Sequence, residues 1–400
     1  SSYDGAAPAV LGTLAEVTPR TVLPGLLVVA LAAAGCGSAP EPAGPSPSMS
    51  DGACPLPSPS LREHAAAHGK TIGTAYRSTF AAGDPCYEEV AGREFGSLTT
   101  EIGTMTNRVA PEAGRFDFRE ADAVADLARR HGQDFQIHSL IWDPLDQQGW
   151  GIVPEYVRTL SDPQRHRFMT ELVTRVVQRY AGRASAVTVV NEPFDQRGVL
   201  QRNAWWRTTS GERYIVDAFR AARLAAPSMK LYLNEHSAET VSDKSTALLA
   251  LARTLRDETV EVTVGGRTER RPLLDGVGFQ AHMLGGADQQ PSTEDMLKNL
   301  RRFTDLGLDI RFTELDVRIP TDKGRAAEAD LQRQARVYST MAGLCRELSR
   351  CTGMTVWGFT DRRSWITDYP ETFSGYGSAN LLDRDYRPKP AWEALRAAFS

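Results

Sequence analysis

The sequence predicts an α/β fold, a closed (β/α)8 TIM barrel, on three observations. The chain has 400 residues, of which 41% are hydrophobic, and a barrel of this kind needs about 250. Short runs rich in β-branched residues alternate with longer amphipathic stretches, the pattern of parallel strands joined by helices. Eight such runs follow residue 60, and eight strands close the barrel.

The expected elements follow one another along the chain without an internal repeat beyond strand and helix. The strands are expected at Thr71–Ala75, Gly96–Thr99, Phe135–Leu140, Ala186–Asn191, Lys230–Leu233, Gly276–Gln280, Asp309–Thr313 and Met354–Phe359. The helices are expected at Arg119–His131, Asp162–Tyr180, Tyr214–Ala226, Ser242–Arg256, Thr293–Leu306, Ala326–Leu348 and Pro390–Phe399. Asp162 is the expected N-cap of the second helix. The alternation of Val and Thr over Glu261–Arg271, around Gly265-Gly266, predicts an inserted hairpin.

The N-terminal part of the chain predicts export. Arg20 precedes an apolar run, Val22–Ala34, which is too short to span a bilayer and ends at Ala-Ala-Gly before Cys36. This ending is similar to a bacterial lipobox, in which the Cys is lipidated and becomes the first mature residue; plain secretion is the alternative. We expect a lipoprotein-type signal peptide over 1–35, a Pro/Ser-rich linker over 36–60, and a catalytic domain over 61–400.

The cysteines agree with an exported protein, where disulfides persist. With Cys36 assigned to the lipid, four of the five cysteines remain to pair. Cys345 and Cys351 lie close together before an expected strand, which favours a bond between them. Cys54 and Cys86 pair by elimination. Buried free thiols are the alternative for both pairs.

The charge balance argues against a polyanionic partner. Lys and Arg number 46 and Asp and Glu number 50, giving a formal net charge of −4. Such a chain offers no basic field for nucleic acid or for an anionic membrane. We expect a monomer with no nucleic-acid partner, secreted and held at the outer face of the bacterial cell membrane only through the lipid on Cys36.

Two glutamates end apolar strand-like runs, where the active sites of such barrels gather. Glu192 follows Val187–Asn191, and Glu314 follows Ile310–Thr313. A single strand-end glutamate is more commonly a cap or an ion-pair partner. Two of them, one preceded by Asn191 and one followed by Asp316, point instead to paired carboxyl chemistry.

Glycosidic bond hydrolysis requires such a pair. One carboxyl protonates the leaving oxygen, and the other, about 5 to 5.5 Å away, acts as the nucleophile of a retaining enzyme. The amide of Asn191 is suited to a sugar hydroxyl beside the acid. Asp316 shares a strand face with Glu314, because side chains alternate, and can orient a histidine.

The motifs around these residues resemble glycoside hydrolase family 10, the xylanase family of retaining barrels, over about residues 71–399. They are Gly114–Phe118 with Ala121-Asp122, His138–Trp142, Val190–Asp195, Lys230–Asn234, Gly276–His282, Thr313–Asp316, and Val356–Asp361 with Ser364-Trp365. The Cys345–Cys351 pair before the eighth strand also resembles this family. The order of these motifs along the chain matches the family.

The resemblance implies a role for each site residue. Glu192 would be the general acid/base and Glu314 the nucleophile. The substrate-binding residues would be Glu101, His138, Trp142, Asn191, Gln280, His282, Trp357 and Trp365, with Asp316 orienting His282. Core packing is the alternative for the tryptophans, and a satisfied structural histidine for His138 and His282. No metal and no organic cofactor is implied.

Three departures from the family fall on the side that binds the non-reducing sugars. Glu101 is followed by Ile102 where members have Asn, and no Lys lies between Glu101 and Arg115. The third-strand motif continues with Asp143-Pro144-Leu145 in place of His and then Gln. His236-Ser237 replaces Tyr-Asn after the fifth strand. These differences favour a changed sugar preference on unchanged catalytic machinery.

The leading functional hypothesis is therefore a retaining β-glycoside hydrolase of the endo-β-1,4-xylanase type, which cleaves extracellular plant-type polysaccharide by double displacement. Two alternatives remain. One is a related glycosidase acting on a β-glucan, an arabinose-containing chain or an aryl glycoside. The other is an inactive carbohydrate-binding surface lipoprotein, against which the intact Glu192 and Glu314 argue.

Overall fold

The computed structural model describes residue 54 and residues 56–145, 151–286 and 290–400. The expected signal peptide, Cys36 and most of the expected linker lie outside these residues. The chain divides into two units, Ser1–Asp51 and Gly52–Ser400. The fold described below is that of the second unit.

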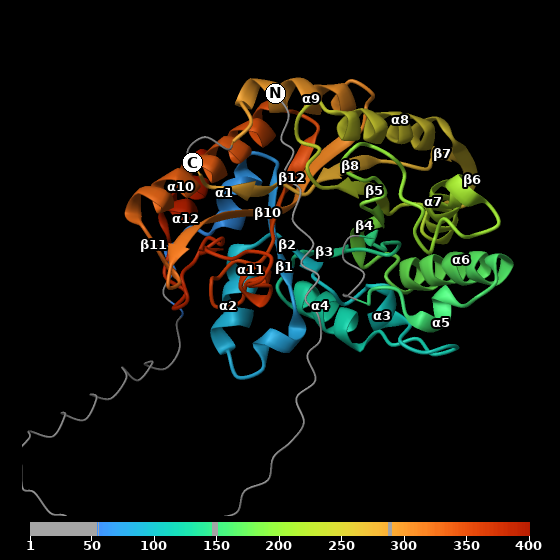
Figure 1. Cartoon of the computed structure of the whole chain (residues 1–400), viewed down its shortest axis with the longest axis horizontal. Helices are drawn as coiled ribbons and strands as arrows, with labels where there is room; N and C mark the ends of the chain where they lie inside the picture. Colours follow the sequence, from blue (N-terminus) through green and yellow to red (C-terminus); the bar gives the residue numbers. More distant parts are fainter. Residues whose placement is uncertain (1–53, 55, 146–150, 287–289) are drawn as a thin grey trace, which may run out of the picture. The chain divides into compact units, whose positions relative to one another are not determined.

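The expected parallel barrel is present and closed (Figure 1). Its strands are β1 (Thr71–Tyr76), β2 (Ser97–Thr100), β3 (Asp134–Ile137), β4 (Ala184–Asn191), β5 (Lys230–Glu235), β8 (Gly276–Phe279), β10 (Asp309–Asp322) and β12 (Cys351–Val356). Each strand pairs in parallel with its neighbours in this order. β10 pairs with both β8 and β12, and β12 pairs with β1, so the ring is complete.

β10 is much longer than expected and continues beyond the barrel. It first pairs in parallel with β9 (His282–Leu284) and then in antiparallel with β13 (Tyr376–Gly377) and β11 (Arg325–Ala326). The extension keeps Val317 and Ile319 buried. A strand that carries alternating apolar residues can stay extended wherever partner strands are available.

The helices flank the strands, and Figure 1 shows α6, α7, α8 and α9 outside the ring. The expected helices are α4 (Arg119–Arg130), α6 (Asp162–Arg179), α7 (Tyr214–Ala225), α8 (Asp243–Asp257), α9 (Thr293–Thr304), α10 (Glu328–Glu347) and α12 (Pro390–Ala398). Not expected from the sequence were α1 (Leu61–Ala67), η1 (Ser78–Ala81), α2 (Pro85–Glu94), α3 (Thr106–Val109), α5 (Glu155–Arg158), η3 (Gly211–Arg213) and α11 (Trp365–Asp368).

One cap differs from the expectation. Ser161, not Asp162, is the N-cap of α6, and it forms a capping box with Gln164. Asp162 is the first helical residue, where its charge still favours the helix N-terminus. The inserted hairpin was predicted correctly. β6 (Thr259–Val264) and β7 (Arg267–Pro272) pair in antiparallel around Gly265 and Gly266, which both have positive φ.

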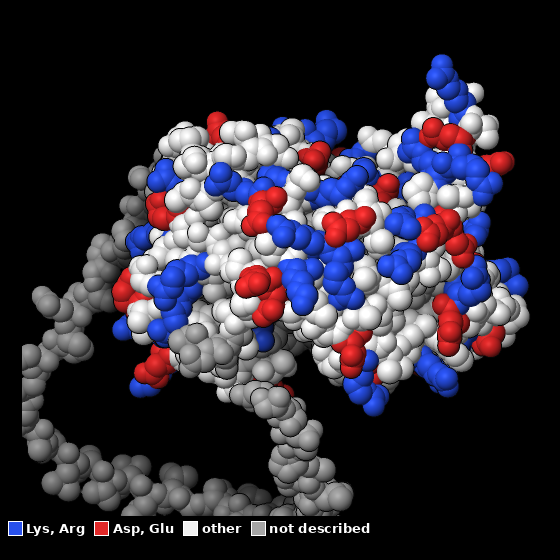
Figure 2. Space-filling view, turned by 90° about the horizontal axis from the view of Figure 1, so that it is seen from above, with Lys and Arg blue, Asp and Glu red and all other residues white. Residues whose placement is uncertain are grey.

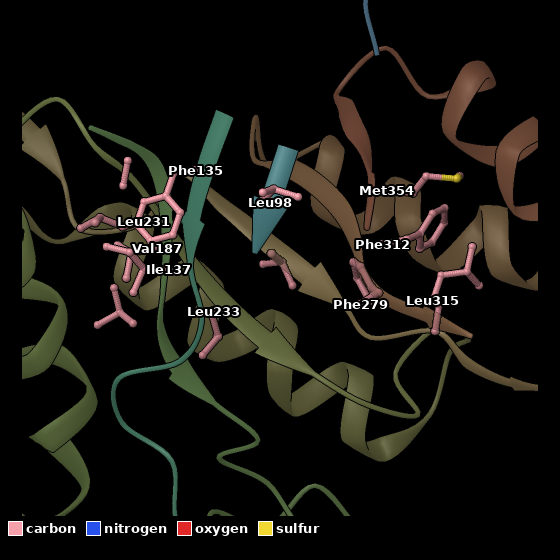
Figure 3. Packing of buried hydrophobic residues seen from close by; sticks show 14 of the residues in the cluster. Leu98, Phe135, Ile137, Val187, Leu231, Leu233, Phe279, Phe312, Leu315 and Met354 are labelled. Carbon is pink, nitrogen blue, oxygen red and sulfur yellow. The ribbon is translucent and has the colours of Figure 1, made fainter. Parts of the chain in front are cut away.

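The core lies between the strands and the helices (Figure 3). Outward-pointing residues of neighbouring strands face one another, as Phe312 of β10 does with Met354 of β12 and Ile137 of β3 with Val187 of β4. All four side chains are at most 1% exposed. The rigid ring that results fixes the positions of residues at the strand ends.

The described residues contain two disulfides, in the pairing expected from the sequence. Cys54–Cys86 joins the segment before α1 to α2, and Cys345–Cys351 joins the end of α10 to the start of β12. Lys and Arg are interspersed with Asp and Glu on the face shown in Figure 2. Among the helices of the described residues, none combines the length and the apolar character needed to cross a membrane.

Candidate active site

A cavity of about 780 Å³ opens at the carboxyl ends of the barrel strands. Its lining includes every residue that the sequence analysis assigned to catalysis or sugar binding: Glu101, His138, Trp142, Asn191, Glu192, Gln280, His282, Glu314, Trp357 and Trp365. Asp316, assigned an orienting role, lies behind this wall and is 0% exposed. The barrel therefore brings together residues from β2, β3, β4, β8, β10 and β12 or from the segments that follow them.

Glu192 directly follows β4 in a left-handed backbone conformation, with φ of 50°. A non-glycine residue in this region stores strain, which its surroundings must balance. Its backbone N–H donates to the Asn234 carbonyl at 3.0 Å. The side chain accepts hydrogen bonds from Trp142 Nε1 at 2.9 Å and from Gln280 Nε2 at 2.7 Å. Both carboxyl oxygens are thus held in place.

Glu314 lies on β10 and is 5% exposed. Its Oε1 accepts from Asn234 Nδ2 at 2.7 Å, and its Oε2 faces His282 Nε2 at 3.2 Å. Burial alone would raise the pKa of this carboxyl, but the neighbouring His138 and His282 rings and the Asn234 amide outweigh it and lower the pKa. Glu314 is therefore held as a carboxylate, the form a nucleophile requires.

His282 lies between two carboxylates. Its Nδ1 is 2.9 Å from Asp316 Oδ2, which also accepts from Trp365 Nε1 at 2.7 Å. Burial opposes protonation of the ring, but Asp316 and Glu314 outweigh it and raise the pKa of His282 to about 10. The ring is therefore cationic at neutral pH. Its contact with Asp316 fixes the orientation of the ring toward Glu314.

Asn234 was not identified as a site residue from the sequence, although it ends the Lys230–Asn234 motif. Its Nδ2 donates to both Asn191 Oδ1 (2.8 Å) and Glu314 Oε1 (2.7 Å), and its Oδ1 accepts from Thr313 Oγ1. Gln280 Nε2 is 3.4 Å from the same Asn191 oxygen. A continuous chain of hydrogen bonds therefore runs from Glu192 through Gln280, Asn191 and Asn234 to Glu314.

Aromatic rings form the walls beside the carboxyls. His138 stacks edge-on against Trp357 with ring centroids 5.0 Å apart, and its Nε2 is 3.6 Å from Glu314. Burial lowers the pKa of His138, although the nearby carboxylates oppose this. Trp365 lies against His282, also at 5.0 Å. The ring faces and edges in this cavity suit the C–H faces of sugar rings.

Behind Glu192 lies a buried ion pair that the sequence analysis also missed. Lys244 and Glu235 are 1% and 0% exposed and 2.8 Å apart, and Lys244 Nζ is 3.0 Å from His236 Nε2. Burial raises the pKa of the Glu235 carboxyl, and the nearby Lys244 ammonium opposes this rise. Glu235 accepts from the backbone N–H of Phe194 at 3.2 Å. The pair thus ties β5 to the turn that carries Glu192.

The residues that depart from the family separate into two groups. Ile102 lines the cavity and packs with Met105, Trp142 and Ile152 in a small apolar cluster. Asp143 is instead buried in an ion pair with Arg158, and it accepts from the Ala204 N–H at 2.8 Å.

Neither Asp143 nor Leu145 belongs to the described lining of the cavity. The cavity wall therefore differs from the family at Ile102 and at His236 and Ser237, which also line it, but not at Asp143 or Leu145. Glu101, which does line the cavity, pairs with Arg77. No group of three or more His, Cys, Asp or Glu side chains able to hold a metal ion occurs within the described part of the chain.

Comparison with known proteins gives one consistent result. Residues 60–398 match the model of Glycosyl hydrolase family 10. Endo-1,4-beta-xylanase 1 of Humicola insolens is 33% identical over 333 residues, which cover 83% of this chain and 72% of that protein. An endo-1,4-beta-xylanase of Agaricus bisporus is 32% identical over 83% of this chain and 91% of its own. Native xylanase 10B of Thermotoga maritima superposes with a TM-score of 0.75 at 31% identity, covering 85% and 98% of the two chains.

The raised pKa of His282 makes a prediction for stability against pH. Between about pH 6.5, where an unfolded histidine titrates, and about pH 10, the folded protein keeps a proton that the unfolded chain releases. The stability that His282 contributes in this way is fully present below its pKa in the unfolded chain. It is lost as the pH rises through its pKa in the folded protein. Asp316→Asn should lower the pKa of His282, so the loss should occur at lower pH.

Urea unfolding across this window measures the effect. The loop change Asp195→Asn, at a half-buried carboxylate outside the cavity lining, serves as a control and should leave the pH profile unchanged over this window. If Asp316→Asn and the wild type lose stability over the same pH range, the Asp316–His282 coupling is wrong.

Proposed function

The chain belongs to glycosyl hydrolase family 10, and from this we propose that it is a retaining endo-β-1,4-xylanase that uses Glu192 as general acid/base and Glu314 as nucleophile. The observation that carries the assignment is the hydrogen-bonded chain joining the two glutamates in one cavity. The side chains around Glu192 differ from those around Glu314, as the roles of acid/base and nucleophile require. Glu314 faces the cationic His282, whereas Glu192 faces the neutral donors Trp142 and Gln280.

The proposed reaction has two steps. Glu314 attacks the anomeric carbon while Glu192 gives its proton to the departing sugar oxygen, and a covalent glycosyl-enzyme forms. Glu192, now a carboxylate, removes a proton from water, which displaces Glu314 with overall retention. Asn191 and Gln280 contact the sugar at the cleavage point, and Trp357 and Trp365 pack against its ring. The Thermotoga petrophila xylanase 10B, solved with xylobiose, is similar to this chain with a TM-score of 0.74 and 31% identity, covering 86% of this chain and 98% of its own.

The two carboxyls should respond differently to removal. Glu314→Ala should lower turnover by several orders of magnitude on every substrate, because the nucleophile acts in the first step. Glu192→Ala should spare the first step for aryl glycosides with good leaving groups, which need no proton. Azide should partly rescue Glu192→Ala and give a β-glycosyl azide, whereas any azide product of Glu314→Ala should be α-configured. An α-configured azide from Glu192→Ala would reverse the roles.

The apolar cluster around Ile102 leads to a specificity prediction. A polar contact to a sugar hydroxyl contributes about 0.5–1.5 kcal/mol, so Ile102 in place of Asn should weaken binding of a bare xylose unit. Ile102→Asn should raise kcat/KM on linear xylo-oligosaccharides by about 2- to 10-fold. Leu145→Gln, which restores a family residue outside the described cavity lining, is the matched control and should give no gain. If the two changes alter kcat/KM equally, Ile102 does not determine the sugar preference.

We also propose that the enzyme is exported and anchored by a lipid on Cys36, on the sequence evidence of the apolar run and the small residues before it. In a bacterium with a lipoprotein pathway, the full chain should partition into detergent with the membranes, and Cys36→Ser should release or mislocalise it. Several acyl chains are expected, because one chain binds only marginally. An intact mass with unmodified Cys36 would contradict the anchor.

A further inference from the structure

A buried cation lies inside the barrel, apart from the groups used in catalysis. Arg311 alternates with the outward-pointing Ile310 and Phe312 on β10, so its side chain points into the ring, and the residue is 6% exposed. Its Nη2 donates across the interior to Ser97 Oγ on β2 at 3.2 Å. Gly73 on β1 permits this approach, because a Cβ there would lie 2.0 Å from the same Ser97 oxygen.

The guanidinium has hydrogen-bond partners but no charge partner. With its amide oxygen turned toward the guanidinium, Gln136 on β3 accepts from Nη1 at 2.5 Å and from Nη2 at 2.9 Å. No described carboxylate forms an ion pair with Arg311; Asp134 acts on it only from a distance. Burial lowers the pKa of Arg311, which reflects how unfavourable the isolated charge is. Neutral amide and hydroxyl groups reduce this cost but do not cancel it.

A small cavity adjoins the unbalanced charge. It has a volume of about 20 Å³ and is lined by Arg311 together with Thr99, Gln136, Ile137, His138, Ala186, Val187, Thr188, Tyr232 and Thr313. Arg311 Nε and Thr99 Oγ1 have no protein hydrogen-bond partner among the described residues. Two residues that each carry an unpartnered donor, one of them charged, therefore line a space that admits one small atom or ion.

We propose that this interior cavity binds one monatomic anion, chloride under ordinary salt conditions, between Arg311 and Thr99. A halide accepts hydrogen bonds from both donors and neutralises the guanidinium, whereas a water molecule satisfies the donors and leaves the charge. A phosphate, sulfate or carboxylate is too large for the space. The site is distinct from the sugar cavity, although His138 borders both.

Diffraction from crystals of the protein soaked in sodium bromide tests the site directly. The proposal expects an anomalous bromide peak within hydrogen-bonding distance of Arg311 Nε and Thr99 Oγ1. Density at this position without anomalous signal, as given by water, would overturn the proposal. This outcome does not depend on catalytic activity, so it is separable from the xylanase assignment.

Thermal unfolding gives a second test in solution. At constant ionic strength, replacing sodium gluconate by sodium chloride should raise the unfolding midpoint of the wild type saturably, by about 2–4 °C. Gluconate is too large to enter the cavity. Arg311→Gln and the nearly isosteric Thr99→Val should each reduce or abolish the chloride-specific rise.

The control is Arg223→Met, which removes another buried arginine that pairs with Asp275, and it should keep the full chloride effect. If Arg311→Gln does not fold, Thr99→Val and the bromide crystal still decide. An equal chloride effect in Thr99→Val and the wild type, or none in the wild type, would reject the anion site.

Discussion

Closure of the parallel sheet, through the pairing of β10 with both β8 and β12, is the constraint on which the site depends. A closed ring has no edge, so every strand has a fixed position relative to every other strand. The hydrogen-bonded chain from Glu192 to Glu314 draws on β4, β5 and β10 and on the segment after β8. The two residues of each hydrogen bond in it are 43 to 89 residues apart in the sequence. In an open sheet, a small hinge movement between these strands would break this chain of hydrogen bonds.

Electrostatic differences within one cavity separate the two glutamates. The cation on His282 exists because Asp316 lies behind it, and this cation in turn stabilises the charge on Glu314. The position of Glu192 depends instead on backbone contacts. Its strained backbone is tied to the Asn234 carbonyl, and the following turn is tied to the carboxyl of Glu235. The pair of Glu235 with Lys244 therefore supports the segment that carries Glu192.

The sequence predicted the barrel, its eight strands, the seven long helices and ten of the residues that line the cavity, because these depend on local periodicity and on short motifs. It did not predict contacts between distant segments. The burial of Asp143 against Arg158 depends on how the segment after β3 packs on α5 and on Ala204, so Asp143 could not be distinguished from a sugar-binding residue. Asn234 looked like an ordinary strand end, because its two acceptors come from other strands. The long β10 was missed because its outer partners, β9, β11 and β13, are too short to recognise.

The disulfide between Cys54 and Cys86 has a mechanical meaning if the chain is attached through its N-terminus. Tension along the N-terminal segment would enter the domain at Cys54 and pass through the covalent bond into α2. Helix α1, the whole of β1 and η1 lie between the two cysteines in sequence, so they would be shielded from the load. Peeling of β1 from β12, which would open the ring at its N-terminal strand, would then require breakage of a covalent bond and not only of hydrogen bonds. A domain held in this way would keep its barrel closed under pulling.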